Sequence, residues 1–143
     1  MRVEVFPVCQ TREFSAALLT ALSDGWTEVA EILREIGVGE IAKLEELEIS
    51  LLDDDEMAQL HGEFLQDPTP TDVMTFEHGE ILIGVEVAGR QALEFRTSTD
   101  REIALYGIHG MLHLAGFDDQ SPEEGKMMAN RQEELLTRVF GEL

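Results

Sequence analysis

The sequence contains little cysteine, proline or basic residue. Cys9 is the single cysteine, so no disulfide can form within the chain, and the fold does not need an oxidising compartment. Four prolines in 143 residues, without repeats or low-complexity tracts, exclude a proline-rich linker. No apolar run approaches the roughly 18 residues that cross a bilayer. We therefore expect residues 1–143 to form a single soluble, cytoplasmic domain that does not associate with membranes.

Basic residues are outnumbered three to one, since 10 Lys and Arg stand against 30 Asp and Glu, for a net charge of −20. This excess opposes nonspecific attraction to nucleic acid and to anionic membranes. It does not exclude RNA as a partner, because a bound metal dication can make a cleft locally positive. Hydrophobic residues make up 43% of the chain, which is enough to build a core.

Hydrophobic periodicity predicts helices interspersed with short strands. The expected strands cover residues 1–8, 44–52, 72–76 and 81–85, the last two forming a hairpin. The expected helices cover residues 14–22, 24–36, 53–65, 85–95, 99–115 and 122–140. We therefore expect an α+β fold, in which helices pack on a small mixed β-sheet and a central helix and its following turn carry the functional site.

Local signals set the expected helix ends. Asp24 offers an N-cap for the second helix, and Gly37 ends it. The acidic run Asp53–Glu56 caps the third helix better than it forms a metal site, because no further ligands follow at the calcium-loop spacing. The last helix is expected to open at Ser121 with Pro122 in its first turn, and Gln66–Thr71 is expected to be a loop.

The segment from His109 to Asp119 places two histidines four residues apart, before a glycine and two aspartates. Residues four apart on an α-helix lie on one face, so the imidazoles of His109 and His113 can converge on one ion. Gly116 can take the left-handed conformation that ends a helix, which would bring Asp118 or Asp119 to the same point. Two nitrogens and an oxygen suit zinc, with a fourth position left for water.

A structural role is the alternative for this helix. Residues 103–115 are apolar almost all round, so the helix should be buried, and one histidine there would be a hydrogen-bonded core residue. Two imidazoles on one face, beside an acidic turn, both need partners, and one metal ion provides them. We therefore favour a transition-metal site.

Two blocks together resemble a known family. The block Thr69–Phe76 (TPTDVMTF) comes before the histidine block that starts at His109, and their order and spacing resemble the YbeY family from about Leu47 to Leu136. The resemblance implies a bacterial metal-dependent endoribonuclease that is linked to ribosomal RNA maturation. It implies ribosomal RNA as the partner and allows ribosomal proteins as further partners.

The resemblance also implies a ligand set. The family places three histidines at the positions of His109, His113 and Asp119, so an aspartate stands here for the third histidine. A carboxylate oxygen binds zinc at nearly the distance of an imidazole nitrogen, so we expect these three residues to hold one zinc ion. The added negative charge should weaken the ion as a Lewis acid or favour harder ions. Asp118 is expected to be a turn residue or to support the ligands.

A second departure from the family lies upstream. The family usually carries an asparagine, a tyrosine and an arginine where this chain has His61, Phe64 and Leu65, and that arginine is important for activity. An RNA-cleaving metal site needs cationic groups that hold the phosphate, and leucine cannot supply one. Arg96 and Arg101 are the nearest candidates in the sequence, although each fits a solvated surface charge better.

These observations predict a zinc-dependent, single-strand-type endoribonuclease of ribosomal RNA processing. His109 and His113 would act through a metal-bound water that attacks phosphorus, and no separate protein base is evident. His61 and His78 are expected on a surface helix and in the hairpin turn, where either could lie near the cleft.

Two other functions stay open. A metallopeptidase-like hydrolase shares the ligand spacing, but zinc peptidases carry a glutamate base directly after the first histidine, where this chain has Gly110. A noncatalytic ribosome-associated factor, whose metal only stabilises the fold, is favoured by both departures from the family pattern. An open coordination position would separate a catalytic site from a structural one.

Overall fold

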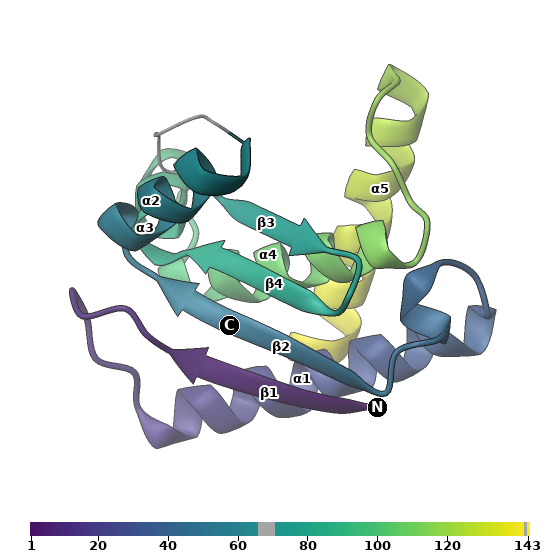
Figure 1. Ribbon diagram of the computed structural model, residues 1–143, viewed down its shortest axis with the longest axis horizontal. Helices are drawn as coiled ribbons and strands as arrows, with labels where there is room; N and C mark the ends of the chain where they lie inside the picture. The colour runs from purple at the N-terminus through teal and green to yellow at the C-terminus, as the bar shows by residue number, and fades with distance from the viewer. Residues whose placement is uncertain (66–70, 142) are drawn as a thin grey trace.

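Among residues 1–65, 71–141 and 143, which the computed structural model describes, the strands form one mixed sheet (Figure 1). The strands are β1 (Arg2–Pro7), β2 (Glu46–Leu52), β3 (Val73–Phe76) and β4 (Glu80–Gly84), in the order β1-β2-β4-β3. β1, β2 and β4 are parallel, and β3 pairs antiparallel with β4, so β1 and β3 form the edges. The predicted α+β fold with a small mixed sheet is confirmed, including its hairpin.

Helices α1 (Ala16–Ile36) and α4 (Thr99–Leu114) pack behind the sheet, and α3 (Val85–Phe95) packs along α4 (Figure 1). The main core lies between these helices and the sheet, where Ile49 of β2 and Ile81 of β4 meet Trp26 of α1 and Ile108 of α4. All four side chains are fully buried, and the two isoleucines on the strands lie on the sheet face that the helices cover.

The opposite face of the sheet is covered at one corner only, as far as the described residues show. There α2 (Asp54–Leu65) encloses a second cluster of Leu52, Met57, Met74 and Leu82. Leu82 alternates with Ile81 and Ile83, which face the main core, so β4 is apolar on both faces. Glu46 and Glu48 on β2 remain exposed beyond the reach of α2.

One predicted helix boundary is wrong. Asp24 is not an N-cap, because residues 16–36 form one continuous helix that begins after Ser15, whose hydroxyl accepts a hydrogen bond from Leu18 N at 3.1 Å. In the sequence, residues 23–25 have the pattern of a boundary between two helices. In the structure, Gly25 instead allows α1 to pack closely against Phe140. A Cβ at this position would overlap the ring of Phe140. The predicted end at Gly37, with φ of 73°, is confirmed.

Three of the other helices also begin at a residue whose side chain caps the helix. Asp53 Oδ1 accepts from Glu56 N at 3.0 Å, and Glu56 Oε1 accepts from Asp53 N at 2.9 Å, which together form a capping box at the start of α2. Ser98 caps α4 and Ser121 caps α5 (Pro122–Leu135). The acidic run at the start of α2 is therefore a helix cap, as predicted.

The chain after Leu135 continues as one wider helical segment, η2 (Leu136–Phe140), so the predicted helical end near Phe140 is confirmed. A short helix, η1 (Glu40–Ala42), comes before β2. The predicted loop at Gln66–Thr71 lies outside the described residues except for Thr71, as does the side chain of Leu65. Within the described part of the chain, no helix combines the length and apolarity that a membrane span needs.

Candidate functional site

The two histidines lie on the last turns of α4, where this helix packs closely on the sheet. Gly110 faces β3 and β4. A Cβ at this position would lie 2.9 Å from Ile81 Cδ1 and 3.0 Å from Thr75 Oγ1. The glycine therefore lets α4 approach the strands, and position 110 points at the sheet. No glutamate base of the zinc-peptidase kind could be carried at this position without moving the helix.

A turn ends α4 and begins the return of the chain. Gly116 has a φ of 92°, its N–H donates to His113 O at 3.0 Å, and Phe117 N donates to Leu112 O at 3.0 Å. These two bonds form a Schellman motif, the common glycine-ended helix terminus. The predicted helix stop at Gly116 is confirmed, and it redirects the chain toward Asp118 and Asp119.

The hydrogen bonds of the histidine rings orient both Nε2 atoms. His113 Nδ1 lies 3.1 Å from the carbonyl oxygen of Phe117, and His109 Nδ1 contacts Oε1 of Gln132 on α5. Both partners are acceptors, so each Nδ1 carries the ring proton and donates it. Each Nε2 is then unprotonated in the neutral ring, and its lone pair is available to a ligand.

The available lone pairs converge. His109 Nε2 and His113 Nε2 lie 3.1 Å apart, and Asp119 Oδ2 lies 3.9 Å from the first and 4.0 Å from the second. The two ring nitrogens are at hydrogen-bond distance, so either a proton shared between them or a metal cation would relieve the repulsion between the lone pairs and the carboxylate. The three predicted residues therefore come together into a group that could hold a metal ion.

Asp118 has a different task in the turn. Its Oδ1 accepts a hydrogen bond from Asp119 N at 2.8 Å, so its carboxylate is directed back to the chain. The side chain of Asp119 is 48% exposed, whereas those of His109 and His113 are 25% and 31% exposed. The acidic member of the group therefore comes from the surface, and the two imidazoles come from the edge of the core.

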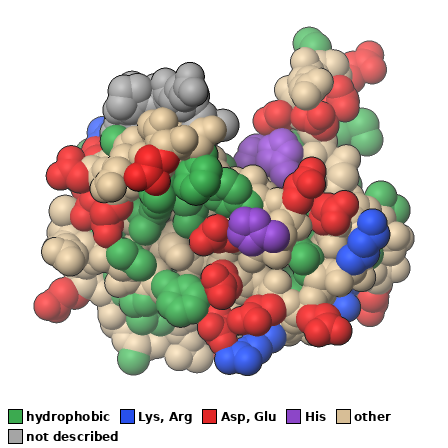
Figure 2. Space-filling model, viewed as in Figure 1, with side chains coloured by type: hydrophobic (Ala, Val, Ile, Leu, Met, Phe, Trp, Pro, Cys, Tyr) green, Lys and Arg blue, Asp and Glu red, His purple; other side chains and the backbone are tan. Residues whose placement is uncertain are grey.

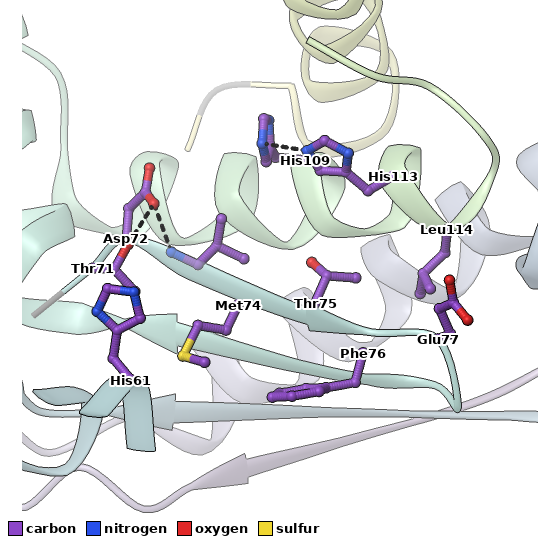
Figure 3. A pocket seen from close by; sticks show the side chains of 11 residues that line it. His61, Thr71, Asp72, Met74, Thr75, Phe76, Glu77, His109, His113 and Leu114 are labelled. Carbon is purple, nitrogen blue, oxygen red and sulfur yellow. Dashed lines mark hydrogen bonds between the residues drawn. The ribbon is translucent and has the colours of Figure 1, made fainter. Parts of the chain in front are cut away.

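A cavity of about 500 Å³ opens beside the two histidines, between α4 and the exposed edge of β3. Thr75 points toward α4 and its histidines, whereas Phe76 points to the other side of the strand (Figure 3). His61 of α2 also lines this cavity, so the prediction that it could lie near the cleft is confirmed. A second cavity of about 320 Å³ lies against His109 on the α5 side.

The cavity is acidic. Asp72 and Glu77 line it, and none of its described lining residues is Lys or Arg. Arg101 pairs with Glu133 at 2.9 Å, and neither it nor Arg96 lines either cavity as far as the structure is described. Figure 2 shows many acidic and few basic side chains on this face of the molecule.

Two residues near His109, Asp72 and Tyr106, were assigned no role from the sequence. Asp72 lines both cavities, and its Oδ1 accepts from Val73 N at 2.8 Å. Tyr106 is buried beside the second cavity, where burial first and the carboxylates of Glu102 and Asp72 second raise the pKa of its hydroxyl far above the usual value. Tyr106 therefore stays protonated and cannot act as a base near neutral pH.

His78 lies in the hairpin turn, as predicted, and its Nε2 is 3.2 Å from Glu80 Oε1. Its side chain is 70% exposed. Cys9 is buried, with its Sγ 3.2 Å from Thr11 Oγ1, which fits a packing role.

Known proteins resemble this chain over most of its length. The profile of the family described as Endoribonuclease YbeY matches residues 15–140. A protein of that name from Pelotomaculum thermopropionicum is 34% identical, over 76% of this chain and 80% of its own length. Another from Geobacillus thermodenitrificans is 29% identical, over 99% of this chain and 98% of its own length.

A solved structure is also similar. The solution structure of a Thermotoga maritima protein superposes with a TM-score of 0.69 and 26% sequence identity, covering 98% of this chain and 90% of that protein. The match to the family profile spans His109, His113 and Asp119, since they lie between residues 15 and 140. The chain belongs to the YbeY family of endoribonucleases.

Proposed function

We propose that this protein is a zinc-dependent endoribonuclease that cleaves single-stranded segments of ribosomal RNA during its maturation. One observation carries the proposal: His109 Nε2, His113 Nε2 and Asp119 Oδ2 converge, and the ring protons of both histidines are engaged elsewhere. We also propose that the protein acts in the cytoplasm and that ribosomal proteins are further partners. It treats residues 1–143 as one domain, because the main core joins Val3 of β1 to Leu135 at the end of α5.

Zinc fits these donors. Two atoms that each lie about 2.0–2.1 Å from a tetrahedral zinc ion are about 3.3 Å apart, and the two Nε2 atoms are separated by 3.1 Å. Asp119 Oδ2 is 3.9–4.0 Å from them and would move inward by about half an ångström. Its exposed side chain can make this movement by rotation. The mixed nitrogen and oxygen set also suits zinc better than magnesium or calcium.

In the proposed reaction, zinc and the protein side chains would have separate roles. When bound, zinc would activate water, polarise a phosphoryl oxygen and supply positive charge beside the phosphate. His109 and His113 would hold the ion, and the contacts of their Nδ1 atoms with Gln132 and the carbonyl of Phe117 would keep both Nε2 atoms directed at it. Neither position 110, which faces the sheet, nor Tyr106, which keeps its proton, supplies a base.

The noncatalytic alternative predicts a closed metal site. Three protein donors would leave a position on zinc for water, and the two histidine donors line the cavity of about 500 Å³. Both features favour catalysis over a purely structural role. The metallopeptidase-like alternative is weakened by Gly110, which leaves no glutamate after the first histidine.

The variant His113→Ala tests the proposal. It removes one of two nitrogen donors, so we expect wild-type protein to bind about one zinc per chain and the variant to lose both the zinc and RNA cleavage while staying folded. Metal content by mass spectrometry, cleavage of structured ribosomal RNA with and without added zinc, and circular dichroism measure the three quantities. Glu123→Gln, which removes an exposed carboxylate in the first turn of α5, is the control and should change none of them.

Two outcomes would contradict the proposal. Full nuclease activity in a metal-free preparation would exclude the zinc mechanism. Zinc at one equivalent per chain, without cleavage of any RNA and with unfolding on chelation, would favour the structural alternative.

A further inference from the structure

Three aromatic rings form a row at the exposed edge of the sheet. Phe64 of α2 meets Phe76 of β3 edge-on, with ring centroids 5.3 Å apart at 67°. Phe76 in turn stacks on His78 of the hairpin turn, with centroids 5.7 Å apart at 25°. Phe64 is 58% exposed although it is a large hydrophobic side chain, and His78 is exposed as well. The row therefore presents π surface to solvent.

The ring row is continuous with the cavity beside the histidine pair. Phe76 lines that cavity together with His61, His109 and His113, and it is also the central ring of the row. Phe76 lies across β3 from the histidines, so the cavity wraps around the open edge of this strand (Figure 3). Figure 2 shows hydrophobic side chains next to histidine side chains on this face. A linear ligand that reaches the histidines can therefore extend onto the rings.

The charge of this surface limits how a polyanion can bind. The described lining carries Asp72 and Glu77 and no Lys or Arg, and the chain as a whole has a net charge of −20. Residues 66–70, which lie outside the described part of the chain, read Gln-Asp-Pro-Thr-Pro and contain no Lys or Arg. Contacts between protein cations and phosphates, the usual source of affinity for nucleic acid, are missing from the described part of this cavity. Stacking of bases on aromatic rings needs no protein cation.

We propose that Phe64 and Phe76, extended by His78, form a stacking site for an unpaired base of single-stranded RNA next to the scissile phosphate. This inference rests on the proposed function and adds how the single-stranded substrate is held, which is by stacking of a base on the rings. A duplex cannot use the site, because its bases are already stacked on one another. Purines, with the larger π surface, should bind better than pyrimidines.

The variant Phe64→Leu tests this site, with Phe95→Leu as the matched control. Phe95 ends α3, is 62% exposed and takes no part in the ring row. With a fluorescein-labelled 12-nucleotide oligoriboadenylate and zinc-loaded protein, we expect Phe64→Leu to raise KM about tenfold with little change in kcat, and Phe95→Leu to change neither. Zinc content and melting temperature should stay at wild-type values in both variants.

Salt and base identity supply independent readouts. Between 50 and 200 mM KCl, we expect KM to change by less than about twofold, whereas a protein with 6–10 phosphate contacts loses roughly 10³–10⁵ in affinity over this range. Oligoriboadenylate should be bound better than oligouridylate, and Phe64→Leu should reduce that preference. Equal KM values for the two phenylalanine variants, or a steep salt dependence in wild type, would overturn the stacking site.

Failure of the stacking site and failure of the proposed function are distinguishable. Loss of cleavage in His113→Ala, with equal KM in Phe64→Leu and Phe95→Leu, would retain the nuclease and reject the ring row. If wild type cleaves no RNA, the probe stays intact, and fluorescence anisotropy then measures its binding directly. Weaker binding in Phe64→Leu alone would retain the ring row without the nuclease. Binding of an unstructured peptide, but not of oligoriboadenylate, would overturn the proposal and favour the metallopeptidase-like alternative.

Discussion

The group of His109, His113 and Asp119 combines side chains from the C-terminal half of α4 and from the turn that follows it, and these two regions hold their side chains in different ways. His109 and His113 extend from a helix packed between β3, β4, α1 and α3, and each ring is held by a hydrogen bond at Nδ1. Asp119 extends from a surface turn, and its side chain is half exposed. The two nitrogen positions are therefore determined by the core, whereas the oxygen position can vary without disturbing the fold.

Glycines show the same contrast between the two regions. Gly107 and Gly110 allow α4 to contact Trp26 and the sheet, so they serve packing. Gly116 has open space around a Cβ except for Val38 Cγ1 at 3.5 Å, and it serves the backbone conformation of the turn. A substitution at position 119 should therefore disturb the fold less than a substitution of either histidine.

The largest expected loss of stability comes from a substitution in α4. In Gly107→Ala the new Cβ would overlap the indole of Trp26, whose Nε1 donates to Ala104 O at 3.0 Å, so both α1 and α4 must shift. We expect the free energy of unfolding to fall by about 3 kcal/mol or more, against about 1 kcal/mol for Gly116→Ala in the turn. Urea denaturation followed by circular dichroism measures both.

Gly89→Ala is the matched control for this prediction. It lies inside α3, and its Cβ would meet Thr99 at an ordinary contact distance of 3.7 Å. Alanine should be neutral there or stabilise the helix by up to about 1 kcal/mol. Equal losses in Gly107→Ala and Gly116→Ala would show that the packed helix and the turn do not differ as described.

The sequence was sufficient to predict features that depend on local spacing. The strand around Leu47, the helix cap at Asp53, the helix stop at Gly116 and the grouping of both histidines with Asp119 all involve residues close in the chain. The family resemblance reinforced the last of these. The predicted helix start at Asp24 is wrong. A capping residue beside a glycine is typical of a helix start, whereas Gly25 is here required for packing against Phe140.

Features that depend on contacts between distant elements could not be predicted. Gln132 reaches His109 only because α5 packs against α4, and 23 residues separate the two in the chain. The exposed position of β3 depends on β4 being inserted next to β2, which no local pattern encodes. The ring row also joins α2 to the hairpin, so the partners of Phe64 could not be inferred from its own neighbourhood.

Gln132 gives the next largest expected effect. Its Oε1 accepts the ring proton of His109, so Gln132→Met should allow the ring to change tautomer and lower zinc affinity by roughly 10- to 100-fold. Gln132→Glu retains an acceptor and should retain affinity. Zinc affinity is measured by competition with a chelator, and ¹⁵N chemical shifts of the zinc-free protein report the tautomer of His109.

Gln10→Met is the control for the glutamine substitution, because Gln10 is exposed and far from α4 in the chain. It should leave zinc affinity unchanged. If Gln132→Met and Gln132→Glu lowered affinity equally, packing of α5 rather than the hydrogen bond would orient His109.

The smallest expected effect concerns the turn. Asp119→His removes one negative charge from the ligand group and restores the histidine that the family resemblance places there, so the ion should act as a stronger Lewis acid. We expect kcat to rise by up to about tenfold and the pH of half-maximal cleavage to fall, with the free energy of unfolding unchanged because the side chain is half exposed. Adding Leu65→Arg, which introduces the cation that the family resemblance places there, should also lower KM, because arginine can pair with a phosphate. Glu123→Gln makes the same change in net charge outside the ligand group, so an equal gain there would assign the effect to overall charge. No gain in the double variant would mean that neither departure limits activity, and that the surface turn tolerates exchange of its ligand at no catalytic cost.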